Sequence, residues 1–243
     1  MAHVEAGLRS FDWSMPEEGN RVLVDRVSRW LFATEPAALR NLAAEGITEG
    51  IHLCGNVMID SLLKVLPRAR EARARERLGL PERYCVLTMH RPGNVDDRAR
   101  FGRMLRALAP ITAQVPLVYP VHPRARASLD TLELPEGFRC IDPLSYLEFV
   151  GLVAEATLVL TDSGGLQEET TVLGVPCMTL RPNTERPITI ELGTNELVDT
   201  DETRIRELGQ RALDGAWRKG SIPDGWDGRA AERIVAVLVD ALA

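Results

Sequence analysis

The sequence contains little of what marks a membrane-bound, secreted or metal-binding protein. No apolar stretch approaches the ~20 residues that a membrane-spanning helix requires, and no basic segment followed by an apolar core indicates a secretory signal. The cysteines occur singly, without the spacing of a metal site, which predicts reduced, buried thiols in a cytoplasmic protein and no metal centre. They are Cys54, Cys85, Cys140 and Cys177.

Positive charge is also scarce. The 243 residues include 29 Lys and Arg against 35 Asp and Glu, so the formal net charge is 29 − 35 = −6. This balance argues against nucleic acid as a partner. An arginine-rich run from Lys64 to Arg77 is interrupted by Glu71 and Glu76, and we interpret it as a solvated helix face. The apolar fraction of 45% excludes a disordered chain.

What the chain does contain is an alternation of short apolar runs with segments of helical length. The runs are continuous rather than alternating in polarity, which is typical of strands buried on both faces of a parallel sheet. The predicted strands are Leu31–Thr34, Ile51–Leu53, Tyr84–Met89, Leu117–Val121, Phe138–Ile141, Thr157–Thr161 and Pro176–Leu180. The predicted helices are about Glu17–Trp30, Pro36–Glu45, Met58–Leu78, Asp97–Ala113, Tyr146–Ala156, Gly165–Leu173, Asp201–Trp217 and Gly228–Leu242. The alternation predicts an α/β doubly wound fold.

Two regions are distinguished along the chain. Pro67 is expected to kink or end the helix near Leu62–Leu78, and residues 84–180 beyond it form one Rossmann-like series. We therefore expect residues 1–62 to be the C-terminal remnant of a Rossmann-like domain, and residues 63–243 to be a second Rossmann-like domain with a C-terminal helix. The strand His3–Ala6 begins almost at residue 1, so the first domain is expected to lack its beginning.

The sequence Thr-Asp-Ser-Gly-Gly at residues 161–165 follows an apolar strand and opens a helix. Glycines allow an anion to approach the free backbone N–H groups at the positive end of the helix dipole. Ligands of open α/β sheets also bind beyond the carboxyl ends of strands. One interpretation is a phosphate site formed by Ser163, Gly164 and Gly165, and the other is a tight turn capped by Ser163.

Further candidates are expected to follow strands at the same edge. Arg186 lies in a loop, where a guanidinium can pair bidentately with phosphate; the alternative is a surface arginine paired with Glu185. His90 ends a strand and offers an imidazole for phosphate binding or acid–base chemistry, with a structural role as the alternative. His122 ends another strand in the same way.

Carboxylates form a third group of candidates. Glu5 ends the first short strand and Glu17 follows 12 residues later, so the two could act as acid and base on one substrate. Alternatively, Ser14 and Glu17 form a capping box at the start of a helix. Glu168 and Glu169 are expected in the first turn of the glycine-opened helix, where the dipole favours them, and Glu169 could instead accept sugar hydroxyls.

These residues belong to a series of motifs: His3–Arg9, Pro16–Arg21, Gly55–Asn56, His90–Arg91, Tyr119–His122, Asp162–Glu169 and Thr184–Pro187. In order and spacing, the series resembles the non-hydrolysing bacterial UDP-N-acetylglucosamine 2-epimerases, over nearly the whole chain. The resemblance implies a GT-B architecture, in which two Rossmann-like domains enclose a UDP-sugar, with only the end of the first domain in this chain. It implies interconversion of UDP-GlcNAc and UDP-ManNAc for cell-surface polysaccharide biosynthesis, without NAD or a required metal. A cytoplasmic enzyme that is a homodimer at full length is expected.

The resemblance also assigns roles to residues. Catalysis is expected of Glu5, Glu17 and His90, near the sugar. Glu169 is expected to bind the uridine ribose, and the stretch Leu144–Phe149 to lie against the uracil. The set expected to bind UDP is His90, Leu144, Phe149, Ser163, Gly164, Gly165, Glu169 and Arg186, with the Ser-Gly-Gly turn, His90 and Arg186 on the phosphates.

The expected chemistry is elimination of UDP followed by its re-addition with inversion at C2. The hydrogen at C2 is not adjacent to a carbonyl, so positive charge must first develop on the ring as UDP leaves. Groups that stabilise the departing diphosphate therefore matter most. The family begins with roughly a hundred further residues, so the isolated chain is expected to be inactive or weak. The alternatives are a GT-B glycosyltransferase and a non-catalytic nucleotide-sugar-binding remnant.

Overall fold

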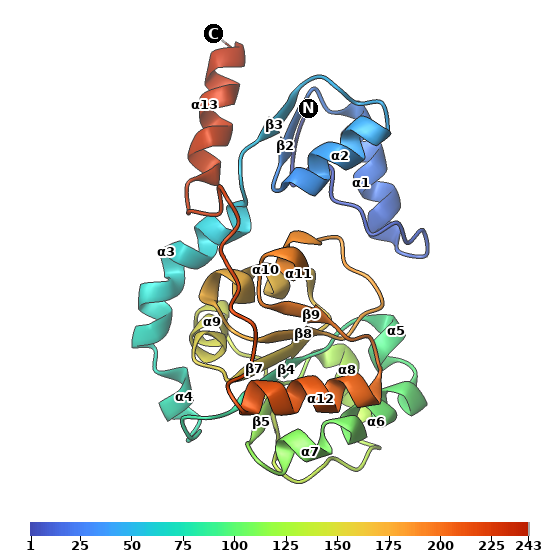
Figure 1. Cartoon of the computed structure of the whole chain (residues 1–243), viewed down its shortest axis with the longest axis vertical. Coiled ribbons are helices and arrows are strands. Elements are labelled where there is room, and N and C mark those ends of the chain that lie inside the picture. The colour runs from blue at the N-terminus through green and yellow to red at the C-terminus, as the bar shows by residue number, and fades with distance from the viewer. Residues whose placement is uncertain (243) are drawn as a thin grey trace.

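The computed structural model describes residues 1–242, and this part of the chain contains two parallel β-sheets (Figure 1). The smaller sheet has the order β1-β2-β3 and consists of β1 (Ala2–Val4), β2 (Trp30–Ala33) and β3 (Ile51–Leu53). Its crossover connections contain α1 (Pro16–Val27) and α2 (Pro36–Ala44). The strand predicted at His3–Ala6 ends two residues too late, because Glu5 adopts a left-handed backbone conformation with φ of 65° and leaves the extended conformation of the strand.

The larger sheet has the order β6-β5-β4-β7-β8-β9, with every neighbouring pair parallel. Its strands are β4 (Cys85–Thr88), β5 (Leu117–Pro120), β6 (Phe138–Ile141), β7 (Leu158–Thr161), β8 (Cys177–Thr179) and β9 (Asn195–Leu197). The strand order reverses between β4 and β7. In doubly wound folds, the crevice at the carboxyl ends of the two strands flanking such a reversal is where ligands bind.

Helices cover both faces of the larger sheet, which is why its strands are apolar on both sides. The remaining helices are α3 (Val57–Glu71), α4 (Ala74–Arg77), α5 (Pro92–Val95), α6 (Arg98–Ala107), α7 (Ala109–Thr112), α8 (Pro123–Leu129), α9 (Tyr146–Ala154), α10 (Gly164–Leu173), α11 (Ile188–Glu191), α12 (Glu202–Leu213) and α13 (Ala230–Leu242). Cys85 and Leu87 of β4 pack with α6, α7, α8 and α12 on one face, and Val86 packs with α4, α9 and α10 on the other.

Pro67 was expected to end or kink its helix. It does not end the helix, because α3 continues through Pro67 to Glu71. Residues of α3 on both sides of the proline, Ile59, Leu62 and Ala69, are buried and hold the helix in place. The chain turns instead at Arg73, whose φ is 46°. Packing thus outweighs the loss of one helical hydrogen bond.

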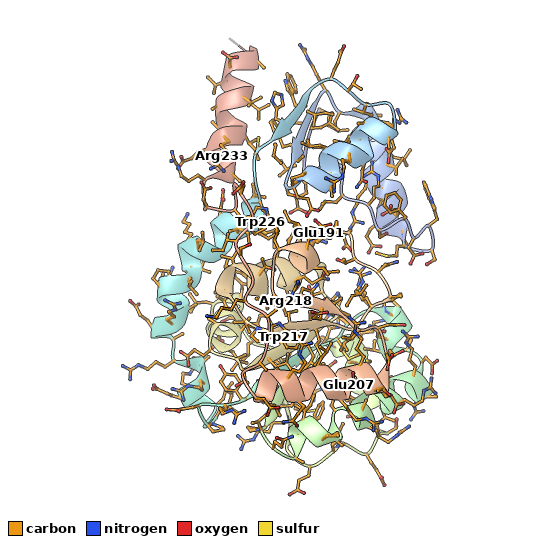
Figure 2. All side chains as sticks on the ribbon, viewed as in Figure 1. Glu191, Glu207, Trp217, Arg218, Trp226 and Arg233 are labelled. Atoms are coloured by element: carbon orange, nitrogen blue, oxygen red, sulfur yellow. The ribbon has the colours of Figure 1, made fainter. Side chains whose placement is uncertain are left out.

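The C-terminal segment returns to the smaller sheet (Figure 1). Ile234 of α13 packs against Phe32 and Cys54, and the indole N–H of Trp226 donates to the carbonyl of Thr34 at 3.0 Å. Figure 2 shows Trp226 between the upper and lower parts of the molecule. This segment therefore connects the small sheet to the large one.

Other sequence expectations need smaller corrections. Cys140, on the edge strand β6, is exposed, unlike Cys54, Cys85 and Cys177. The helices expected at Met58–Leu78 and Asp97–Ala113 are each broken into two. None of the helices within residues 1–242 combines the length and apolarity that crossing a membrane requires.

Candidate functional site

Asp162 organises the crevice at the ends of β4 and β7. Its buried carboxylate accepts hydrogen bonds from the backbone N–H groups of His90 and Arg91 at 3.1 and 2.9 Å, and from the Asn94 amide at 3.2 Å. Burial alone would raise the pKa of Asp162, but these donors and the His90 ring outweigh it and lower the pKa. The turn after β4 is thereby fixed to the end of β7.

The His90 imidazole lies over this turn with one nitrogen engaged. Its Nδ1 lies 2.8 Å from Asp162 Oδ1, and the side chain is 44% exposed. Nε2 is therefore the nitrogen available to a ligand, as in other carboxylate-oriented histidines. His122 lies next to it, with ring centroids 5.7 Å apart, but its Nδ1 caps α8 by accepting the Arg124 N–H. The structure thus gives His122 a local structural role.

A mainly apolar cavity of about 200 Å³ opens beside His90. Leu144 and Phe149, the ends of the stretch expected to lie against the uracil, both line it. The other lining residues are Thr88, Met89, His90, Pro120, His122, Pro123 and Pro143. The structure therefore brings the predicted base-binding stretch to the same crevice as His90.

The Ser-Gly-Gly turn begins α10 as predicted. Ser163 is the N-cap residue, but its hydroxyl caps no amide, and its own N–H donates to Thr161 Oγ1 at 2.9 Å. The first N–H groups of the helix thus lack a side-chain cap and can serve an anion. A Cβ placed on Gly164 would lie 2.3 Å from Arg186 Nη1, whereas a Cβ on Gly165 would make only an ordinary contact with Met58 at 3.7 Å. The guanidinium therefore lies directly against this turn.

Arg186 is buried, so the alternative of a surface arginine is wrong, although its pairing with Glu185 is correct. Its Nη1 lies 2.6 Å from Glu185, its Nε 2.8 Å from Glu168 and its Nη2 3.9 Å from Glu5. Burial would lower the pKa of Arg186, but the three carboxylates raise it, so the group is a permanent cation. Arg186 and Arg181 likewise overcome burial and lower the pKa of Glu185 to about 2.

Glu5 is directed toward Arg186 by a turn of strained backbone. The Gly7 N–H donates to Asp25 Oδ2 at 3.1 Å, and Asn41 donates to the Gly7 carbonyl at 2.9 Å. Gly7 itself has φ of 79° and lies against the Ala38 carbonyl, where a Cβ would clash. A positive φ at a glutamate is uncommon and is found at functional positions.

Glu17 faces a different cavity from the one beside Leu144. The capping box with Ser14 does not form, because Met15 is the N-cap and Ser14 Oγ donates to Asp12 at 2.6 Å. The Glu17 side chain is left exposed at a cavity of about 560 Å³, which His90 and Arg181 also line. The structure therefore places Glu17 with His90 and Glu5 with Arg186.

Glu169 lies in the second turn of α10 rather than the first, because the helix begins at Gly164. It is buried, and Tyr146 donates its hydroxyl to Oε1 at 2.7 Å. Burial raises the pKa of Glu169, against the opposing effect of this hydrogen bond. Glu168 is likewise in the second turn and is fully buried.

Several residues of this site were missed from sequence. The sequence patterns indicate Asp162 only as part of the turn and Glu18 only as part of the motif Pro16–Arg21, and they do not single out Glu35. Glu18 accepts the N–H groups of Ser10 and Phe11 at 2.9 Å and so fixes the loop before α1. Nothing in the local pattern distinguishes these buried carboxylates from exposed ones. Within residues 1–242, no group of three or more His, Cys, Asp or Glu side chains is arranged to hold a metal ion.

Known proteins resemble this chain throughout its length. Residues 1–239 match the family described as UDP-N-acetylglucosamine 2-epimerase. The UDP-N-acetylglucosamine 2-epimerase of Methanocaldococcus jannaschii is 40% identical over 251 residues, covering 98% of this chain and 68% of the relative. A UDP-2,3-diacetamido-2,3-dideoxy-D-glucuronate 2-epimerase of Pseudomonas aeruginosa is 40% identical over 217 residues, covering 88% of this chain and 60% of the relative.

A solved structure shares the fold. The Methanocaldococcus jannaschii UDP-GlcNAc 2-epimerase, in complex with UDP-GlcNAc and UDP, superposes with a TM-score of 0.86 at 40% identity, covering 98% of this chain and 68% of that one. The predicted α/β fold class of GT-B type is confirmed by this likeness and by the two parallel sheets. The chain belongs to the UDP-N-acetylglucosamine 2-epimerase family.

Proposed function

We propose that this chain binds UDP-GlcNAc and UDP-ManNAc and interconverts them. The observation that carries the proposal is the position of Arg186, buried against the uncapped start of α10 and surrounded by carboxylates that include Glu5. A fixed cation and free backbone N–H groups at one point form a site for a diphosphate. The adjoining apolar cavity at Leu144 and Phe149 suits a planar base.

In this proposal the nucleotide spans the crevice from base to diphosphate. The uracil occupies the cavity beside Leu144 and Phe149, and the Glu169 carboxylate accepts hydrogen bonds from the ribose hydroxyls. The diphosphate contacts the turn at Ser163, Gly164 and Gly165, together with Arg186 and His90 Nε2. The support for this arrangement is the proximity of these groups at one sheet edge, which is where doubly wound folds bind nucleotides.

The reaction needs charge stabilisation before it needs a base. As the C1–O bond breaks, the bonding electrons leave with UDP and positive charge develops on the sugar ring, which acidifies the hydrogen at C2. One carboxylate then removes that proton to give a glycal. UDP returns to C1 as a proton is delivered to the other face of C2. Because the proton is removed from one face of C2 and delivered to the other, the reaction requires two acid–base groups. We assign these roles to Glu5 and Glu17, together with His90.

The test is incorporation of solvent deuterium at C2. UDP-GlcNAc is incubated with the polypeptide at high enzyme concentration in D₂O, because we propose that the isolated chain turns over slowly. UDP-ManNAc and deuterium at C2 of both sugars are expected, as measured by NMR and mass spectrometry. Glu17→Gln should lower turnover by about 10²-fold or more with little change in UDP affinity, because the Glu17 side chain is exposed. UDP binding without any deuterium at C2 would defeat the proposal.

The Pseudomonas relative gives a specific reason to test a second substrate. Its name describes C2 epimerisation of a diacetamido uronate sugar, at the same 40% identity. Both sugars carry the same UDP group, so the nucleotide site does not distinguish them. Parallel assays with the two UDP-sugars decide between them. A GT-B glycosyltransferase would leave C2 unlabelled, and a non-catalytic remnant would bind UDP without turnover.

Two coarser properties belong to the same proposal. We propose that the protein works in the cytoplasm, where its thiols stay reduced, and that the full-length protein is a homodimer. Cys54, Cys85 and Cys177 are buried free thiols, which supports the first. Light scattering on the full-length gene product tests the second.

A further inference from the structure

Two buried carboxylates lie at the junction between the small and large sheets. Glu35 follows β2 of the small sheet, and Glu168 lies on α10 of the large one. Glu35 is 1% exposed and Glu168 is 0% exposed. Within the described part of the chain, none of their carboxylate oxygens accepts a hydrogen bond of good geometry. Two ionised carboxylates in such a place would each carry a large desolvation penalty.

One cation faces several carboxylates at this junction. Arg186 faces both Glu168 and Glu35, and the other charged groups facing the pair are Glu5 and Glu191, both acidic. The backbone of Ile188 and the side-chain amide of Asn56 are the neutral polar neighbours. Figure 2 shows Glu191 at this junction.

Arg186 cannot neutralise all of these groups. Its Nη1 is already 2.6 Å from Glu185, and its Nε is 2.8 Å from Glu168. Glu35 makes no ion pair within residues 1–242. Burial therefore raises the pKa of Glu35 to about 8, and the nearby charge of Glu168 adds to the effect. Burial raises the pKa of Glu168 as well, to about 7, although Arg186 opposes the rise, so Glu168 ionises before Glu35 as the pH increases.

We propose that Glu35 and Glu168 are a positioning pair for Arg186, in which Glu168 ionises first, against Arg186, while Glu35 remains a neutral acid. The ionised Glu168 holds Arg186 Nε, so the guanidinium stays against Gly164. The neutral Glu35 fills the junction without adding negative charge behind the anion site. The inference rests on the proposed function in one respect, that the anion bound at this turn is a diphosphate.

The pair also has a consequence for pH. When Glu35 ionises, it adds a negative charge close to Arg186 and to the proposed diphosphate site. Binding of a diphosphate should weaken as that happens, because like charges interact strongly in a buried site. Every other titrating group is common to the wild type and a Glu35→Gln variant, so the difference between the two proteins isolates Glu35.

The experiment compares Glu35→Gln and Glu168→Gln with the control Glu207→Gln. Glu207 is exposed on α12, at the far side of the large sheet (Figure 2). UDP affinity is measured by calorimetry from about pH 6.5 to about pH 9.5, across the range in which Glu35 titrates. A parallel infrared titration follows the carboxylic-acid C=O band.

We expect wild type and Glu207→Gln to lose about tenfold in UDP affinity relative to Glu35→Gln as the pH passes the Glu35 transition. Glu168→Gln should bind UDP more weakly at neutral pH, and its pH transition should move lower because the neighbouring charge is gone. The infrared band of buried acids should be present in wild type at neutral pH; the part that belongs to Glu35 should disappear with the same transition and should be absent from Glu35→Gln.

The proposal is overturned if Glu35→Gln shows the wild-type pH dependence, or if its infrared band equals that of wild type. A complete lack of UDP binding in wild type would instead refute the proposed function. In that case the infrared titration, which needs no ligand, still decides whether Glu35 is a neutral acid.

Discussion

Glu35→Gln should make the protein more stable at neutral and alkaline pH. The pKa of Glu35 is raised by burial to about 8, from an ordinary value of 4.5. Between about pH 4.5 and about pH 8 the carboxyl group is ionised in the unfolded chain but still protonated in the folded one. Each rise in pH in this range therefore favours the unfolded chain, and the free energy of unfolding of the wild type should fall. A glutamine cannot ionise and removes that dependence.

The size of the effect follows from the two pKa values. The difference of 8 − 4.5 = 3.5 units corresponds to about 5 kcal/mol above pH 8, at about 1.4 kcal/mol per unit. At pH 7 the variant should exceed wild type by about 3 kcal/mol, and near pH 4.5 the gain should be close to zero. Glu207→Gln should follow the wild-type curve at every pH.

Chemical denaturation at a series of pH values measures the effect. The decisive quantity is the slope of the difference in unfolding free energy between variant and wild type, about 1.4 kcal/mol per pH unit between about pH 5 and pH 8. A constant offset reports only how well the amide fits the site. Parallel curves for the two proteins would show that Glu35 is ionised in the folded state at neutral pH and would refute the reasoning.

Other predictions concern the turn, the loop and the base cavity. Gly164→Ala should destabilise the fold by about 1–3 kcal/mol, because its Cβ would meet Arg186 at 2.3 Å; Gly165→Ala, with only Met58 at 3.7 Å, should change stability by less than about 1 kcal/mol, and equal effects in denaturation would contradict this. Asp25→Ala should lower the free energy of unfolding by about 3 kcal/mol or more, because the buried Arg9 guanidinium and the Gly7 N–H lose the carboxylate that they contact at 2.7 and 3.1 Å. The variant should also turn over more slowly, because the turn that carries Glu5 is loosened; unchanged stability and turnover would argue against that role. Tyr146→Phe should destabilise the fold by about 1–3 kcal/mol, because Glu169 loses the hydroxyl that donates to it at 2.7 Å. This loss of stability should be smaller at low pH, where Glu169 becomes neutral; a loss of stability that does not change with pH would indicate a packing effect alone.

The central strands of the large sheet could be predicted because they are buried on both faces by helices. Continuous apolar runs of four or five residues then mark them without ambiguity, as for β4, β5 and β7. Strand β9 was missed because Asn195 and Glu196 give it a polar sequence. Its place is set by pairing with β8 at the edge of the sheet, which local composition does not encode.

The candidate site was predictable in part for a topological reason. His90 and Ser163 each follow a strand, and parallel strands end at one edge, so their meeting follows from the strand order. The burial of Arg186, Glu35 and Glu168 does not follow from local sequence. Glu35 precedes Pro36 and resembles an ordinary helix start, and only the packing of the two sheets removes it from water.

The return of the C-terminal segment to the small sheet constrains the order of events during synthesis. Trp226 and Thr34, which are joined by a hydrogen bond, lie 192 residues apart in the chain. The apolar surface around Phe32 and Cys54 is covered by Ile234, so it stays open until Ile234 has left the ribosome. The large sheet can assemble from contiguous residues before then. The strands of the small sheet are therefore made before those of the large sheet but gain their full packing after them, and this interval is when chaperones have the most exposed surface to bind.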